Sequence, residues 1–307
     1  MAILLAVLGA LLLEHFRPLV QPPAHYRAFA RYSDSLRERL DGGEPQQGLL
    51  AWGAAVLPFL VAAFAVHAWL AGLSPVLGAV FNGAVLYFTG GFKYYVRAAE
   101  AVGGALGAGD VAQARAALGR WSNIDGVQFG PHDVARVGTE RVLALSHRQL
   151  FGPLFWFLAL ALALAGPVGP VLYRLSSILA RRWEGDDQFG YFARQIFHWL
   201  NWPVARVTAL SFAIAGDFED AIFCWRTQAA DWPDAEEGLA LAAGAGALGV
   251  SLGSPLPLAD TILPRPELGL GDEAEAQHIA SAVSLVWRSL AIWLALGVLF
   301  VVAGWAT

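Results

Sequence analysis

The sequence predicts an all-α fold: a polytopic integral membrane helical bundle with four to six membrane helices and further amphipathic cytoplasmic helices. Of its 307 residues, 57% are hydrophobic and only 15% are charged, whereas about 25% are charged in soluble proteins. Several apolar runs lack any charge. The clearest, Gln149–Ala165, approaches the roughly 20 helical residues that cross a bilayer. Twelve tryptophans, several near the ends of such runs, suit the bilayer interface.

Composition also excludes some classes of function. The net charge of −5 argues against nucleic acid as a partner. The lone Cys224 can form neither an internal disulfide nor a cysteine metal cluster. The lipid bilayer is the partner that the sequence does predict.

Apolar length and flanking charge place the membrane helices. Met1–Leu13 is short for a span, whereas Leu49–Leu73 and Val76–Phe92 form a helical hairpin around an uncharged Ser-Pro turn. The remaining expected spans are Gln149–Ala165 and Leu285–Ala306. The stretch 191–215 is apolar but carries arginine and histidine, so it suits either the interface or a bundle around a polar cavity. Whether it crosses the membrane, and hence the side of 216–283, stays open.

We expect one domain over residues 1–307, with polar helical insertions at 14–48 and 93–149 and an acidic, loop-rich region at 216–283. In the second insertion, Asp110 is a plausible N-cap, and Pro131 opens a helix that runs to Ser146. Pro255–Leu270 carries four prolines and is expected to be irregular loop.

The two polar insertions are rich in arginine, whereas the turn between the hairpin helices has no charge. The positive-inside rule therefore places 14–48 and 93–149 in the cytoplasm and the N-terminus in the periplasm. Arginine far outnumbers the single lysine, Lys93, which is typical of a GC-rich bacterial genome. The expected location is the bacterial inner membrane.

No phosphate-binding loop, dinucleotide glycine fingerprint or zinc-protease motif occurs in the sequence. Gly244–Gly249 shares only its glycine content with a phosphate loop, and close helix packing is the preferred interpretation. The acids of Asp217–Asp220 suit a helix start; the alternative is a site for a divalent cation. His198 has no partner at ligand spacing, so no metal site is predicted.

Arg206 follows Asn201 by five residues. A guanidinium near the bilayer needs a partner, and phosphate is a good bidentate one. A structural ion pair with an acid such as Asp217 is equally compatible with the sequence.

The order of several motifs resembles the CobD/CbiB superfamily of cobalamin-biosynthesis membrane proteins, over about 93–300. The motifs are Gly152-Pro-Leu-Phe-Trp-Phe157, Gly166-Pro-Val-Gly-Pro-Val-Leu-Tyr173, Phe189-Gly190, Asn201 to Arg206, Ala245-Gly-Ala-Leu-Gly-Val-Ser-Leu-Gly253, Gly271-Asp272 and Val286-Trp-Arg288. The resemblance implies enzymes that join an aminopropanol unit to adenosylcobyric acid as an amide, with ATP and Mg²⁺. It also covers AmpE proteins, which share the scaffold and are linked to signalling in β-lactamase induction.

Three acidic elements of the enzyme pattern are replaced in this chain. Ala144–Gln149 stands where the enzymes carry carboxylates and an asparagine, Phe197-His198 where they carry paired aspartates, and Leu241 where they carry another acid. Phenylalanine can neither bind a cation nor take a proton. We therefore expect a non-catalytic, AmpE-like component in signalling or envelope assembly.

Two other interpretations stay open. One is an adenosylcobinamide-phosphate synthase-type amide ligase that uses ATP and Mg²⁺ with acids at other positions. The other is a membrane protein that binds a lipid, a small molecule or another membrane protein. The candidate ligand-binding residues are Glu140, His198, Asn201, Arg206, Asp217 and Asp272.

Overall fold

The computed structural model describes residues 2–19, 23–122, 124, 126–161, 163, 165–185, 188–257 and 261–306. Contacts divide the chain into two compact units, and each unit takes two separated stretches of sequence. The first unit comprises Met1–Gly91 and Gln149–Pro203, and the second comprises Phe92–Arg148 and Val204–Thr307. The boundary between the two units at Pro203 and Val204 falls inside the long helix α10, Tyr191–Ala215.

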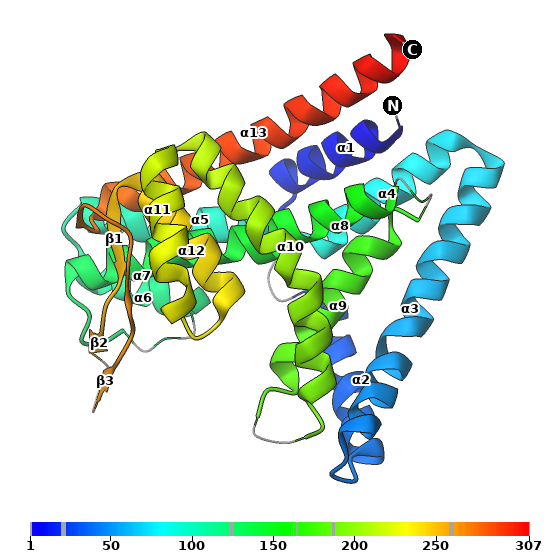
Figure 1. Ribbon diagram of the computed structural model, residues 1–307, viewed down its shortest axis with the longest axis horizontal. Coiled ribbons are helices and arrows are strands. Elements are labelled where there is room, and N and C mark those ends of the chain that lie inside the picture. The colour runs from blue at the N-terminus through cyan, green and yellow to red at the C-terminus, as the bar shows by residue number, and fades with distance from the viewer. Residues whose placement is uncertain are drawn as a thin grey trace. The chain divides into compact units, whose positions relative to one another are not determined.

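The first unit is helical wherever it is regular. In it α3 packs against α2, α4 and α9, while α1 packs along α4 (Figure 1). The N-terminal run, the polar insertion after it and the apolar hairpin all form helices, as expected. Their bounds are α1 Ala2–Phe16, α2 Ala24–Leu40, α3 Pro45–Leu73, α4 Pro75–Thr89, α8 Gly152–Ala161 and α9 Val168–Arg182.

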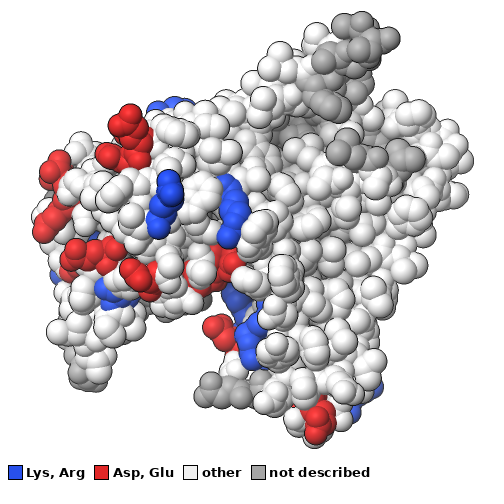
Figure 2. Space-filling model, in the orientation of Figure 1, with Lys and Arg blue, Asp and Glu red and all other residues white. Residues whose placement is uncertain are grey.

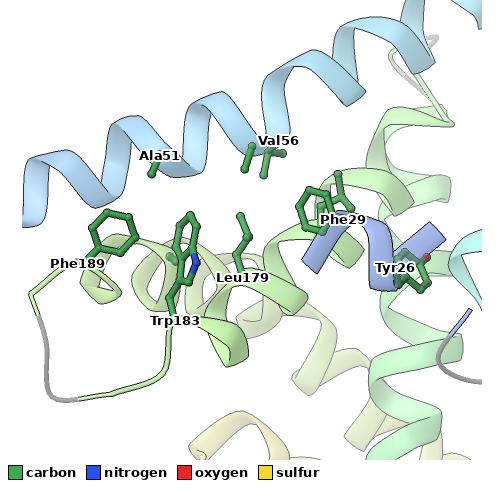
Figure 3. Close-up of a cluster of buried hydrophobic side chains, with 10 residues drawn as sticks. Tyr26, Phe29, Ala51, Val56, Leu179, Trp183 and Phe189 are labelled. Carbon is green, nitrogen blue, oxygen red and sulfur yellow. The ribbon is translucent and has the colours of Figure 1, made fainter. Parts of the chain in front are cut away.

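An aromatic core joins α2, α3 and α9. Phe29 from α2 and Val56 from α3 point toward Leu179 of α9 (Figure 3). Trp183, fully buried just after α9, lies with its ring 5.0 Å from that of Phe189. Each such side chain contributes about 1.5–3 kcal/mol through burial, so this cluster fixes the amphipathic α2 on the apolar helices.

Among the described residues, three helical stretches are long and apolar enough to cross a membrane: Pro45–Leu73, Pro75–Gly107, which is interrupted at Gly90-Gly91, and Ala276–Leu299. Ala2–Phe16 is a shorter apolar helix. Figure 2 shows no Lys, Arg, Asp or Glu over α3 away from its lower end, and the helix exposes Val61 and Trp69. The chain is thus a helical membrane protein with several candidate spans, as the composition predicted.

The expectation that Gln149–Ala165 forms a full span is wrong. A π-helical turn, His147–Phe151, precedes α8, which covers only Gly152–Ala161; Leu162 and Leu164 lie outside the described residues. Pro153, Leu154 and Phe157 of α8 are buried inside the protein. The run is apolar because half of it packs in the protein core, a cause that hydropathy alone does not separate from lipid contact.

The second unit is built around α7, which packs against α5, α12 and α13 (Figure 1). α7 occupies the predicted bounds, with Pro131 in its first turn and the Asp133 carboxylate accepting from the Gly130 amide at 2.9 Å. The helices are α5 Phe92–Gly107, α6 Val111–Ser122, α7 Pro131–Ser146, α11 Phe218–Gln228, α12 Ala235–Leu248 and α13 Ala276–Ala306, with a 3₁₀ turn at Ala229–Asp231.

Paired glycines do not interrupt α5. α5 continues through Gly103-Gly104 and stops only at Gly107, before Asp110, which caps α6 by accepting from the Gln113 amide at 2.8 Å. In α12, a Cβ at Gly246 would lie 2.4 Å from the Asp220 carbonyl oxygen of α11. The glycines of α12 therefore serve close helix packing, as expected.

Short strands occupy the proline-rich stretch that was expected to be irregular, so that expectation is wrong in part. β1 pairs antiparallel with β4 and parallel with β5, whereas β2 and β3 pair with one another. Leu258–Asp260 lie outside the described residues. The strands are β1 Val250–Gly253, β2 Leu256–Pro257, β3 Ile262–Leu263, β4 Glu267–Leu268 and β5 Asp272–Glu273.

The contact between α8 and α9 requires glycine at position 169. A Cβ there would lie 2.1 Å from the Trp156 carbonyl oxygen, a backbone atom that cannot move independently. We expect Gly169→Ala to lower the free energy of unfolding by about 1–3 kcal/mol, the usual cost of overpacking. Thermal unfolding in detergent measures the loss. Gly72→Ala is the control, since nothing lies within 4 Å of its Cβ; equal stability of the two variants would contradict the close approach.

Candidate functional site

Glu140 of α7 is the centre of a buried ionic cluster in the second unit. Its carboxylate accepts from Nη1 of Arg265 at 2.7 Å, from Nη2 at 3.2 Å and from the Gly253 amide at 2.8 Å. The Glu140 and Arg265 side chains are only 7% and 10% exposed. We call Glu140, Arg265 and Gly253 the α7 clasp, because they fasten the strand segment to α7.

The remaining donors of Arg265 are also used. Nη2 donates to the Gly253 carbonyl at 2.8 Å, Nε donates to the Ser254 carbonyl at 3.1 Å, and the guanidinium lies 5.5 Å from the ring centroid of Trp232. A buried ion pair is tolerated when such additional bonds satisfy both partners. Glu140 is thus fully engaged, and its geometry is that of a positioning residue.

Two further side chains of α7 hold the same segment. Arg136 pairs with Asp133 at 2.6 Å and donates to the Pro255 carbonyl at 3.3 Å, and His132 lies 3.1 Å from the Ala274 carbonyl. Asp272 is exposed on β5, where it pairs in register with Val250 of β1. β1 therefore links two predicted residues, Glu140 at one end and Asp272 at the other.

The other predicted residues of the second unit have local roles. Asp217 caps α11 by accepting from the Asp220 amide at 3.0 Å, which confirms the helix-start interpretation of these acids. No group of three His, Cys, Asp or Glu side chains able to hold a metal ion occurs in the part of the chain that the structure describes. Partial burial lowers the pKa of Arg206, and the nearby carboxylate of Glu236 opposes that shift. Glu236 is therefore an acid close enough to act on Arg206.

The first unit holds the two remaining predicted residues. Asn201 is buried, 1% exposed, and its Oδ1 accepts from the Tyr173 hydroxyl at 2.8 Å. His198 is exposed on α10, with its ring 5.7 Å from that of Trp199. Glu140, Arg206, Asp217 and Asp272 belong to the second unit.

Sequence reasoning missed the role of arginines that pair across long sequence distances. Arg148, inside the segment where the enzymes' acidic motif was sought, pairs with Asp234 at 2.6 Å and Glu237 at 3.0 Å at the start of α12. Its neighbour His147 lies 3.2 Å from the Thr208 hydroxyl. The available signal was the excess of acid in 216–283, but nothing in the sequence shows which acid meets which arginine.

The apolar helices define a helical membrane protein, and comparison with known proteins gives the family. The chain belongs to the CobD/CbiB family, described as CobD/Cbib protein, whose match covers residues 3–286. A protein of Stutzerimonas stutzeri (strain A1501) named Cobalamin biosynthesis protein CobD is 36% identical over 302 residues, 96% of each chain.

Further relatives carry the same name. One from Chromobacterium violaceum is 37% identical over 259 residues, covering 83% of this chain and 81% of that protein. One from Mycobacterium tuberculosis (strain ATCC 25618 / H37Rv) is 32% identical over 186 residues, covering 57% and 58%. No solved structure matches the chain.

These similarities contradict the hypothesis of a non-catalytic, AmpE-like signalling or envelope component. Relatives that match almost the whole chain are named for cobalamin biosynthesis, and nothing found supports the AmpE branch. The error came from treating one acidic pattern as a requirement of the enzymes' activity. The full-length match holds despite Phe197 and Leu241, so these replacements do not remove the chain from it.

Breaking the α7 clasp on one side should be costly. Glu140→Gln removes the counter-charge and leaves Arg265 buried, so we expect the free energy of unfolding to fall by about 3–5 kcal/mol. Denaturation in detergent measures the change. Asp34→Asn is the control, because it breaks an exposed pair with Arg182 and should cost at most about 1 kcal/mol.

The double variant Glu140→Met with Arg265→Met separates charge burial from shape. Because both charges are then absent, it should recover much of the loss. A double variant no more stable than Glu140→Gln would contradict the assignment of the loss to an unpaired charge.

Cys224 should be inert in the folded protein. It is fully buried on α11, and burial together with the charge of Asp220 raises the pKa of its thiol to about 11. Since the thiolate is the reactive form, N-ethylmaleimide at pH 8 should label Cys224 only after denaturation. Mass spectrometry of the intact protein measures the labelling. Rapid modification of the native protein would show that α11 opens readily.

Proposed function

We propose that this chain is an adenosylcobinamide-phosphate synthase-type amide ligase of cobalamin biosynthesis in the bacterial inner membrane. Its similarity over 96% of its length to a protein named for cobalamin biosynthesis carries the proposal. The reaction joins the amine of an aminopropanol unit to a corrinoid carboxyl group. ATP would activate that carboxyl as a co-substrate.

Within this proposal the exposure of each predicted residue decides whether it has a structural role or a role in binding substrate. Glu140, fully engaged by Arg265, positions the strand segment. Asp217 and Asp272 are exposed. Gly271, which directly precedes Asp272, has a backbone φ of +111°. We assign Asp272 to the binding of substrate. Arg206 is a further ligand candidate in the second unit, and Asn201 and His198 remain candidates in the first.

No three His, Cys, Asp or Glu side chains gather among the described residues, so they form no closed cage of protein ligands around a magnesium ion. Mg²⁺ is commonly held by substrate phosphates and only one or two carboxylates. The proposal therefore treats the ion as part of the nucleotide substrate and routes no step through a protein-bound metal.

The topology proposed for the enzyme follows from charge. The arginine-rich insertions 14–48 and 93–149 would lie in the cytoplasm, where ATP is available, and the N-terminus in the periplasm. Cysteine accessibility in whole cells, measured at introduced sites in each insertion, tests this arrangement.

Complementation tests the function directly. The chain should restore formation of cobinamide phosphate in a bacterial strain that lacks the synthase. Asp272→Asn should lower that activity at least about tenfold, the effect of losing one charged hydrogen bond. Glu273→Gln is the matched control, since successive strand side chains point to opposite faces.

Full activity of Asp272→Asn would remove this residue from the site. Failure of the well-expressed wild-type chain to restore synthesis would overturn the proposed function itself.

A further inference from the structure

A buried guanidinium in the first unit lacks a counter-charge. Arg174 of α9 is only 4% exposed, yet its Nε and Nη1 donate to nothing. No carboxylate pairs with it among the residues that the structure describes. Guanidinium groups remain charged at every accessible pH, so Arg174 carries a full buried positive charge that no anion among the described residues pairs with.

The neighbours of Arg174 are neutral. Its guanidinium carbon lies 4.8 Å from the ring centroid of Tyr26, whose hydroxyl donates to the Phe88 carbonyl at 2.9 Å. Burial raises the pKa of Tyr26, although the charge of Arg174 and a hydrogen bond from it act in the opposite direction. The phenol therefore stays protonated and supplies no negative charge.

Two further side chains near Arg174 bear on anion binding: the Ser177 hydroxyl, which can donate a hydrogen bond, and the exposed His25. Ser177 lies three residues after Arg174, which places both on one side of the helix, and its fully buried hydroxyl has no partner. His25 is exposed, with Nε2 3.4 Å from the same Phe88 carbonyl. Partial burial, and after it the charge of Arg174, lower the pKa of His25. Histidine thus adds no second positive charge at neutral pH.

An uncompensated buried charge is a cost to folding that a cation–π contact offsets only in part. Native proteins satisfy nearly all buried polar groups, and an exception calls for a functional cause or a missing ion. The same helix shows the contrast. Arg182 is half exposed and forms a bidentate pair with Asp34, at 2.8 and 2.6 Å.

We propose that Arg174, assisted by the Ser177 hydroxyl, binds the phosphate group of a substrate. The unused N–H groups of a guanidinium suit the oxygens of a phosphate. The identity of the ligand rests on the proposed function, whose product carries a phosphate ester. Two sources share this chemistry: the phosphate monoester of a short amino alcohol and the phosphates of ATP.

Thermal unfolding of the full-length protein in detergent tests the site. Inorganic phosphate, at constant ionic strength set with chloride, should raise the unfolding temperature of the wild type saturably. Arg174→Met should weaken this response about 10- to 100-fold in phosphate concentration, the effect of losing a charged hydrogen bond. Without phosphate the same variant should unfold at the wild-type temperature or above it, because it buries no charge.

Arg182→Met is the matched control, since it removes an exposed arginine from the same helix and should keep the phosphate response. Arg174→Lys retains the charge without the planar fork and should show a response about tenfold weaker. It provides the test if Arg174→Met does not fold. Parallel titrations with 1-amino-2-propanol phosphate and with ATP identify the source, because the true ligand should lose most affinity in the Arg174 variants.

A wild type that responds to none of the three probes would overturn the site, as would variants at Arg174 that respond as the wild type does. If the chain restores cobinamide phosphate synthesis while phosphate has no effect through Arg174, the site fails and the function stands. If phosphate binds through Arg174 but synthesis is not restored, the site stands and the proposed function fails.

Discussion

In hydrocarbon, every backbone amide and carbonyl must find its hydrogen-bond partner within the protein. This constraint makes helices of the apolar runs of α3, α4 and α13. It also confines irregular backbone to segments that the protein itself covers. The π-helical turn at His147–Phe151 and the short strands of 250–273 lie outside the three candidate spans, so polar chemistry is concentrated beside the apolar frame.

Two buried arginines show how burial and compensation separate structure from function. Arg265 meets a carboxylate, two carbonyl groups and an aromatic face, so its charge is neutralised within the fold. Arg174 is buried to a similar degree and contacts the ring and hydroxyl of Tyr26, but no carboxylate pairs with it among the described residues. The bonds of Arg265 hold the strand segment in place. The unused N–H groups of Arg174 can instead bind an anion from outside the protein.

Much of the fold follows from local sequence. Period, caps and prolines located α2, α7 and the α3–α4 hairpin, because these elements depend on neighbouring residues. The two-residue strands depend instead on register with partners elsewhere in the chain, and no local pattern encodes them. The apolar run at 149–165 was misjudged because burial in protein and burial in lipid select the same side chains.

The candidate site was less predictable than the fold. Composition could show that Arg265 stood among acids, but its partner Glu140 lies 125 residues away. Arg174 carried no signal, since one arginine in an amphipathic helix is ordinary. The functional hypothesis failed for a related reason: the absence of expected acids at Phe197 and Leu241 says nothing about charges that tertiary structure supplies elsewhere.

The α7 clasp has a consequence for the order of assembly during synthesis. Glu140 is made long before Arg265, so α7 must wait for most of the chain to be translated before its carboxylate gains a counter-charge. Contacts so distant in sequence form late and slowly. Until then the Glu140 carboxylate stays solvated, and α7 cannot pack against α5, α12 and α13. The second unit therefore closes as its last helix arrives, and chains that stop before residue 265 would leave α7 exposed to proteolysis.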